Sequence, residues 1–318
     1  MTGYIIRRIL WIIPVLWAVA TITFFLMHAV PGGPFTQDKA LPDPILQALN
    51  HRYHLDQPLW RQYLSYLWDL GHLDLGLSFK GDRDVSYLIQ HGFFVTAQLG
   101  LLSFCVAMAW GLFLGVISAL NKNGPLDYLG VLFATVGASV PNFIAGTFLV
   151  IVFAVELHWF KIVGWGGPID WSDTFTASAW EPRKMVLPVI ALSLLPSAYI
   201  ARIMRASMLE VLNQDYIRTA RAKGLANNVV ILRHAIKNSL IPVLTVMGPI
   251  FAYLVTGSFI IENIFSIPGI GGAFVDAVQA RDYGMIMGTT LFYAAVVAFA
   301  NLAVDILYAT VDPRIRYG

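Results

Sequence analysis

Six long apolar stretches dominate this chain of 318 residues and restrict what it can fold into. They lie at about 9–30, 94–120, 127–155, 185–208, 239–261 and 284–309. A helix needs roughly 17–25 mostly apolar residues to cross a bilayer, whose hydrocarbon offers no partner for free backbone N–H or C=O groups. The sequence therefore predicts an all-α polytopic bundle of six membrane-spanning helices, with residues 1–318 forming a single transmembrane domain.

Composition supports a membrane protein and excludes an ordinary soluble domain. The chain is 57% hydrophobic and 13% charged, whereas soluble proteins average about 45–50% and about 25%. Arg7 and Arg8 before the first stretch, and the A-x-A pattern at 18–20, imitate a signal peptide. The apolar run nevertheless continues to Val30, beyond the roughly 7–15 residues of a signal-peptide core, which predicts a retained span. The lone Cys105 allows no intrachain disulfide.

The distribution of Lys and Arg predicts the orientation in the membrane. If the N-terminus is inside, the cytoplasmic segments hold 12 of the 21 Lys and Arg but only four of the 19 Asp and Glu. The outer segments are longer in total yet poorer in Lys and Arg, which is the positive-inside pattern. We expect a multi-pass membrane protein with both termini cytoplasmic. The charge asymmetry forms no nucleic-acid patch.

A long outer insert, 31–93, is expected between the first two spans. Within it, Pro58 fits the start of a short helix that is rich in Trp and Tyr and too short to cross the membrane. Such a helix suits the membrane–water boundary, where amphipathic rings settle. It equally suits the capture of a substrate-delivery protein, as do Trp159, Trp165, Trp171 and Trp180 in the outer loop 156–183, because Trp is common at both kinds of surface.

Polar and small residues within the spans permit several readings. Val140-Pro141 is a candidate kink that either lines a path or packs a bent helix. Asp305 near the end of the last span is expected to form an ion pair or to take part in gating. Glu262 falls at a span end, where water is expected nearby. Small residues predict close helix contacts at Gly111, Gly115, Gly137 and Gly146.

Motifs for chemistry are missing from the sequence. It contains no G-x-x-x-x-G-K-[ST] phosphate loop, no H-E-x-x-H and no nucleophile with a matching base. The chain is therefore expected not to be an enzyme, to hold no cofactor or metal, and to obtain energy from another subunit.

A polar segment between the fourth and fifth spans, 209–238, is the most informative cytoplasmic feature. Its stretch 215–224 reads DYIRTARAKG, a short cationic helix that Asn213 can cap and that Gly224 can end in the left-handed conformation. Asn227 or Asn228 can then begin a second helix that runs into the fifth span. A helix, sharp turn and helix could present a surface to a soluble partner, or could be a solvated loop that only obeys the positive-inside rule.

This segment resembles the coupling region of binding-protein-dependent ABC importer permeases. The similarity lies in 215–225 and in 232–242, LRHAIKNSLIP, and it favours the dipeptide/oligopeptide/nickel branch because of the longer gap between Gly224 and Pro242. Further matches are PGGP at 31–34, LDQP at 55–58, DLGLS at 74–78, FSIPGIG at 265–271, and NLAVD through DPRIR at 301–316. The start, YIIRR at 4–8, resembles the B-type subunit.

The resemblance implies that the chain lies in the bacterial plasma (inner) membrane and forms half of the translocation path of an ATP-driven importer of di- and oligopeptides. The implied partners are a C-type permease subunit, two ABC ATPase subunits, an extracytoplasmic solute-binding protein and the peptide substrate, within membrane lipid. The residues implied to couple to the ATPase are Asp215, Tyr216, Arg218, Thr219, Ala220, Arg221, Lys223 and Gly224.

Other functions remain open at this stage. An importer of nickel or another small solute belongs to the same branch. An ion-coupled secondary transporter would need a series of ionisable residues in the spans, and a membrane hydrolase would need a nucleophile–base pair. Neither pattern is found in the sequence. The residues that contact substrate are not identified by sequence.

Overall fold

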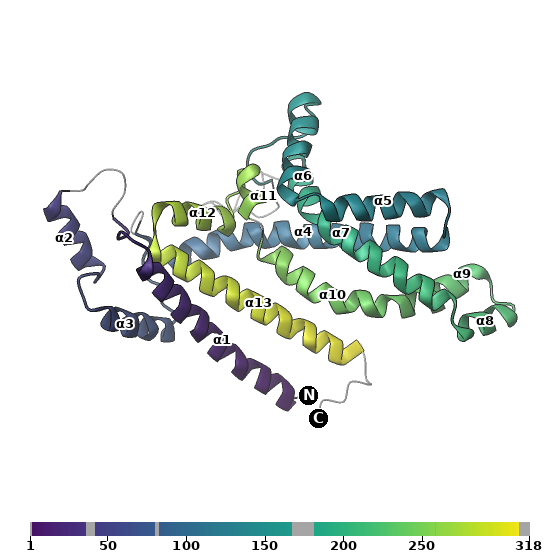
Figure 1. The fold of residues 1–318 in the computed structure, drawn as a ribbon, viewed down its shortest axis with the longest axis horizontal. Coiled ribbons are helices and arrows are strands. Elements are labelled where there is room, and N and C mark those ends of the chain that lie inside the picture. The colour runs from purple at the N-terminus through teal and green to yellow at the C-terminus, as the bar shows by residue number, and fades with distance from the viewer. Residues whose placement is uncertain (1, 36–41, 80–82, 167–180, 258, 312–318) are drawn as a thin grey trace.

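The computed structural model describes residues 2–35, 42–79, 83–166, 181–257 and 259–311, which form an all-helical molecule (Figure 1). Within these residues there is no strand, only an isolated bridge between Leu77 and Asp84. Some residues named in the sequence predictions lie outside the described part of the chain: the side chain of Asp305, the segment 312–318, Trp171 and Trp180. The helices are α1 (Thr2–Ala29), α2 (Asp43–Arg52), α3 (Leu59–Gly71), α4 (Val85–Leu120), α5 (Pro125–Ser139), α6 (Asn142–Leu149), the π-helix η1 (Val150–Glu156), α7 (Pro182–Leu212), α8 (Asp215–Ala222), α9 (Asn227–Val229), the π-helix η3 (Val230–Ile236), α10 (Lys237–Val255), α11 (Phe259–Ile264), α12 (Ile270–Ala280) and α13 (Tyr283–Val311).

Five helical stretches are long and apolar enough to cross a membrane. They are Ile6–Ala29, Val85–Leu120, Pro182–Leu212, Asn227–Ile264 and Tyr283–Ala303. Each contains or overlaps one of the apolar windows of the sequence, so five of the six predicted spans are confirmed as continuous or nearly continuous helix. The prolines inside α1, α7 and α10 do not interrupt these helices.

The third window, 127–155, is not one straight helix. Its two parts, Pro125–Ser139 and Asn142–Glu156, meet at an angle of 106° and count as a sixth span only if the bent pair is taken together. Val140 at the break is extended, with φ −89° and ψ 118°. A residue that precedes proline is pushed out of the helical region, so Pro141 accounts for the break. The predicted kink is therefore confirmed, and α6 points away from the line of α5 (Figure 1).

Close contact between α4 and α7 forms the centre of the bundle. A Cβ added at Gly111 would lie 2.7 Å from Ile200, and one added at Gly115 would lie 2.6 Å from Met204. Because no side chain fits there, these glycines let the two helices approach closely, as the small residues predicted. α5 and α10 pack against the same pair of helices.

The remaining helices lie at the two ends of the bundle. α2, α3 and α12 lie at one end, whereas α8 and α9 lie at the opposite end, the side on which α1 begins and α13 ends (Figure 1). α1 packs mainly along α13 and leaves large apolar side chains exposed along its length, including Trp11, Ile13, Trp17 and Ile22.

Candidate functional site

The predicted coupling segment forms an elbow at one end of the bundle. α8 follows directly on the long helix α7, and the chain then reverses through 223–226 into α9, η3 and α10. Because η3 and α10 continue without a break, the second arm of the elbow is rigidly joined to a membrane span.

The reversal after α8 is closed by a glycine. Gly224 has φ +80°, in the left-handed region that favours glycine. The N–H of Gly224 donates to the carbonyl of Arg221 at 3.0 Å, and the N–H of Leu225 donates to the carbonyl of Ala220 at 3.3 Å. This pair of hydrogen bonds is the Schellman motif. The predicted left-handed helix end at Gly224 is confirmed.

One face of α8 is buried in the bundle. Ile217 is fully buried and Ala220 nearly so, and both belong to a cluster that includes Met204 and Met208 of α7 and Val230 of η3. Burying an isoleucine side chain contributes about 1.5–3 kcal/mol. α8 is therefore held on the same core that joins α7 to α10, so a force on α8 reaches both helices.

The opposite face of α8 is exposed and carries most of the predicted coupling residues. Exposed are Asp215, Tyr216, Arg218, Thr219, Arg221, Lys223 and Gly224, whereas Ala220 lies on the buried face. The Arg218–Asp215 pair, at 3.6 Å, leaves both side chains in water, where an ion pair contributes little. The hydroxyl of Tyr216 accepts a hydrogen bond from Asn238 Nδ2 at 3.1 Å, which ties α8 to the start of α10.

The helix starts differ from the sequence prediction by one residue or more. Asn213 ends α7 and does not cap α8, which begins after Gln214 without a side-chain cap. Asn227 is the first residue of α9, so neither it nor Asn228 precedes the helix as a cap. Asn213 keeps nearly helical backbone angles (φ −94°, ψ −1°) at the end of α7, whereas an N-cap needs extended angles, and these are found at Gln214 (φ −73°, ψ 149°).

An ion pair that the sequence did not reveal lies at the same end of the bundle. Arg205 of α7 donates to both carboxylate oxygens of Asp127, at 2.6 and 2.8 Å. Ser118 of α4 donates to the same carboxylate, as does the backbone N–H of Asn123 at 2.9 Å. Asp127 is only 3% exposed. The network fastens the α4–α5 turn to α7, close to the elbow, and its partners are too far apart in sequence for a local pattern to indicate it.

A buried carboxylate lies near the other end. Glu262 of α11 is fully buried and accepts hydrogen bonds from Thr96 Oγ1 of α4 at 2.9 Å and from the N–H of Gly272 at 3.2 Å. Thr96 Oγ1 in turn accepts from the N–H of Ile270 at 3.0 Å. The sequence prediction that Glu262 lies close to water was wrong, because α12 folds back over it. The cluster joins α4, α11 and α12.

A second contact at this end holds the insert 31–93 to α13. Asp282 accepts hydrogen bonds from Ser78 Oγ at 2.5 Å and from the N–H groups of Phe79 and Met285, each at 3.1 Å. The segment 74–78, which resembles the family motif, is therefore held against the start of α13. A Cβ at Gly284 would lie 2.2 Å from the carbonyl oxygen of Leu77, so this approach requires a glycine.

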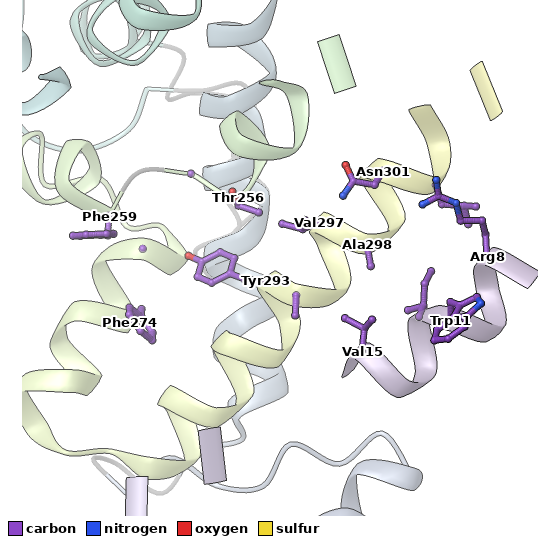
Figure 2. Close-up of a pocket in the computed structure, with 15 residues that line it drawn as sticks. Arg8, Trp11, Val15, Thr256, Phe259, Phe274, Tyr293, Val297, Ala298 and Asn301 are labelled. Atoms are coloured by element: carbon purple, nitrogen blue, oxygen red, sulfur yellow. The ribbon is translucent and has the colours of Figure 1, made fainter. Parts of the chain in front are cut away.

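Among the cavities in the described part of the chain, two differ clearly in character. A polar one of about 790 Å³ lies at the end of the bundle opposite α8, between the start of α4 and the α11–α12 segment, and is lined by Arg83, His91 and Asp276 among others. An apolar one of about 710 Å³ lies between α1, α13 and the turn after α10. Figure 2 shows Arg8 and Asn301 at one end of this apolar cavity and Phe259 and Phe274 at the other. The apolar walls suit a lipid chain or an apolar helix better than a charged solute.

Among the described residues, no group of three or more His, Cys, Asp or Glu could hold a metal ion. The exposed face of α8 and these cavities are features of the described chain that could act on another molecule.

The fold is that of type I ABC importer permeases. A chain of the MetNI methionine ABC transporter in an inward-facing conformation superposes on 71% of this chain and 97% of its own length, with a TM-score of 0.56 and 16% identity. A chain of an amino acid ABC transporter with histidines superposes with a TM-score of 0.54, also at 16% identity, over 71% of this chain and 94% of its own.

Sequence comparison gives the family. The profile described as "Binding-protein-dependent transport system inner membrane component" matches residues 111–317, and that of its N-terminal part matches residues 1–100. The chain belongs to this family of inner-membrane permeases. It is 44% identical to the oligopeptide transport system permease protein OppB of Salmonella typhimurium, over 100% of both chains. It is 43% identical to the dipeptide transport system permease protein DppB of Bacillus subtilis, over 99% of this chain and 98% of that one.

Proposed function

We propose that this chain is one of two permease subunits of an ATP-driven importer of di- and oligopeptides. The observation that carries the substrate class is the full-length identity of 44% and 43% to permeases named for oligopeptide and dipeptide transport. The chain crosses the inner membrane several times as a single domain, 1–318, with the insert 31–93 outside and the coupling region 209–238 in the cytoplasm. Both termini are cytoplasmic.

The proposed partners divide the work of transport. A C-type permease subunit completes the path, an extracytoplasmic solute-binding protein delivers the peptide, and two ABC ATPase subunits supply energy. This division is supported by the lack of a phosphate loop in the sequence.

The exposed face of α8 is the proposed contact with an ATPase subunit. Its support is the two-sided construction of the helix, since Ile217 anchors it in the core while Tyr216, Arg218 and Arg221 face outward. A helix that is fixed to α7 and η3 on one side and free on the other can pass a movement of a soluble partner to two spans. The charged side chains favour an acidic rim on that partner.

The test is transport by the purified complex in liposomes. The complex of this chain with its C-type partner, both ATPases and the binding protein should take up a labelled tripeptide when ATP is supplied, and not when ADP replaces it. The permease pair without the ATPases should hydrolyse no ATP. ATP-driven uptake of Ni²⁺, unaffected by excess peptide and without uptake of the tripeptide, would contradict the peptide assignment and favour the nickel alternative.

A further inference from the structure

The helix α3 has two distinct faces, and one of them is fixed against the outer part of α1. Tyr63 OH lies 2.8 Å from Thr21 Oγ1, and Gln62 Oε1 lies 3.2 Å from His28 Nε2. The ring of Phe24 is 5.3 Å from that of Tyr63 between centroids and 98% of its surface is buried. These contacts set both the position of α3 beside α1 and its rotation about its own axis.

The other face of α3 is apolar and exposed. Trp60, Leu64 and Trp68 are 62%, 55% and 71% exposed. They are spaced four residues apart, so they lie on one side of the helix. Three large apolar groups in a row would be unfavourable in water, where a patch of this kind marks a contact surface.

The depth of α3 along α1 indicates what covers this face. Thr21 lies eight residues before the end of α1, which corresponds to about 12 Å along the helix axis. Ile22 and Leu26, in the same two turns of α1, are 59% and 62% exposed, as expected for side chains in contact with lipid. α3 therefore lies at the level of the outer lipid leaflet. Amphipathic helices at a membrane interface bury their apolar face by about 5–10 Å.

Residue types on α3 also favour lipid over a soluble partner. Trp is the side chain most suited to the headgroup boundary, because its ring is apolar and its N–H can reach water or phosphate. The Arg61 guanidinium lies 5.7 Å from the centre of the Trp60 ring, at the edge of the apolar face, where a cation meets lipid phosphates. We propose that Trp60, Leu64 and Trp68 form a lipid-contacting surface that lies in the outer interface of the membrane beside α1.

The experiment measures the depth of single spin labels in the complete importer complex, reconstituted in phospholipid vesicles without the binding protein. Cys105 is first replaced by Ser, and a nitroxide is then attached to Leu64→Cys or Trp68→Cys. Asp69→Cys is the matched control, because Asp69 is exposed on α3 but lies about 140° around the helix from Leu64 and about 100° from Trp68. Collisions with dissolved O₂, which concentrates in lipid, are compared with collisions with a water-soluble nickel chelate.

The surface is lipid-contacting if the labels at Leu64 and Trp68 collide more with O₂ than with the chelate, while the label at Asp69 shows the reverse. Greater collision with the chelate at Leu64 and Trp68 would overturn the proposal, since the face would then be in water. Shielding from both reagents would also overturn it, because another protein subunit would then cover the face. Chelate access that disappears only after the binding protein is added would assign the face to docking of that protein.

Discussion

Replacing Gly224 tests whether the shape of the α8 elbow matters for coupling. The residue has φ +80°, and a Cβ built on it meets no atom within 4 Å. Gly224→Ala therefore causes no clash and costs only the strain of a left-handed L-residue, about 1–2 kcal/mol. That energy corresponds to a factor of about 5–30 in the population of molecules whose chain keeps the left-handed turn after α8. Gly224→Asn should cost less, because Asn tolerates this conformation, and Gly224→Val should cost more.

The assay is ATP-driven peptide uptake and substrate-stimulated ATPase activity of the reconstituted complex. We expect uptake to fall in the order Gly, Asn, Ala, Val, with several-fold loss at Ala and with subunit assembly retained. Gly164→Ala is the matched control, since Gly164 has φ +88° and an equally empty environment but lies in the loop between η1 and α7, far from α8 in sequence. It should transport normally. Wild-type uptake by Gly224→Ala, or equal loss in both variants, would refute the reasoning.

Three further predictions concern the buried polar contacts and the charge of α8. Arg205→Met leaves the carboxylate of Asp127 buried without its partner and should lower the free energy of unfolding by about 3–5 kcal/mol. The measurement is the thermal unfolding midpoint, which should fall in Arg205→Met and partly recover when Asp127→Asn is added. Thr96→Val removes a hydrogen bond to the carboxylate of Glu262 and should cost about 1–3 kcal/mol, seen as faster hydrogen exchange in α12 but unchanged exchange in α8. Arg221→Glu should slow association with the ATPase most at low salt and least at high salt, because complementary fields act mainly on association rate; a rate equal to wild type across a salt series would exclude steering.

The sequence predicted the spans well because membrane helices carry a strong local signal. The window 185–208 lies within α7, and the expected helix after Pro58 is α3, which begins at Leu59. The left-handed end of α8 was also predictable, because it depends only on the glycine that directly follows a short cationic helix. These features depend on neighbouring residues only.

Features set by distant residues could not be predicted. Glu262 was placed near water because its neighbours in sequence end a span, yet Thr96, 166 residues away, and the returning α12 enclose it. Asp127 and Arg205 are 78 residues apart, and no spacing rule connects them. The break at Val140 was predictable from Pro141, but its size of 106° depends on how α6 packs against α7 and α11.

The proposed contact between α8 and an ATPase subunit is tested most directly by site-specific cross-linking. In a Cys105→Ser background, Thr219→Cys places a thiol on the exposed face of α8, while Lys122→Cys places one in the exposed α4–α5 turn at the same end of the bundle. A short bifunctional thiol reagent is applied to the assembled complex, whose ATPase subunits carry single cysteines on the surface proposed to face α8. The account predicts a permease–ATPase product from Thr219→Cys that changes in yield when ATP is bound, and little from Lys122→Cys. No product from Thr219→Cys in a complex that still transports peptide would contradict it.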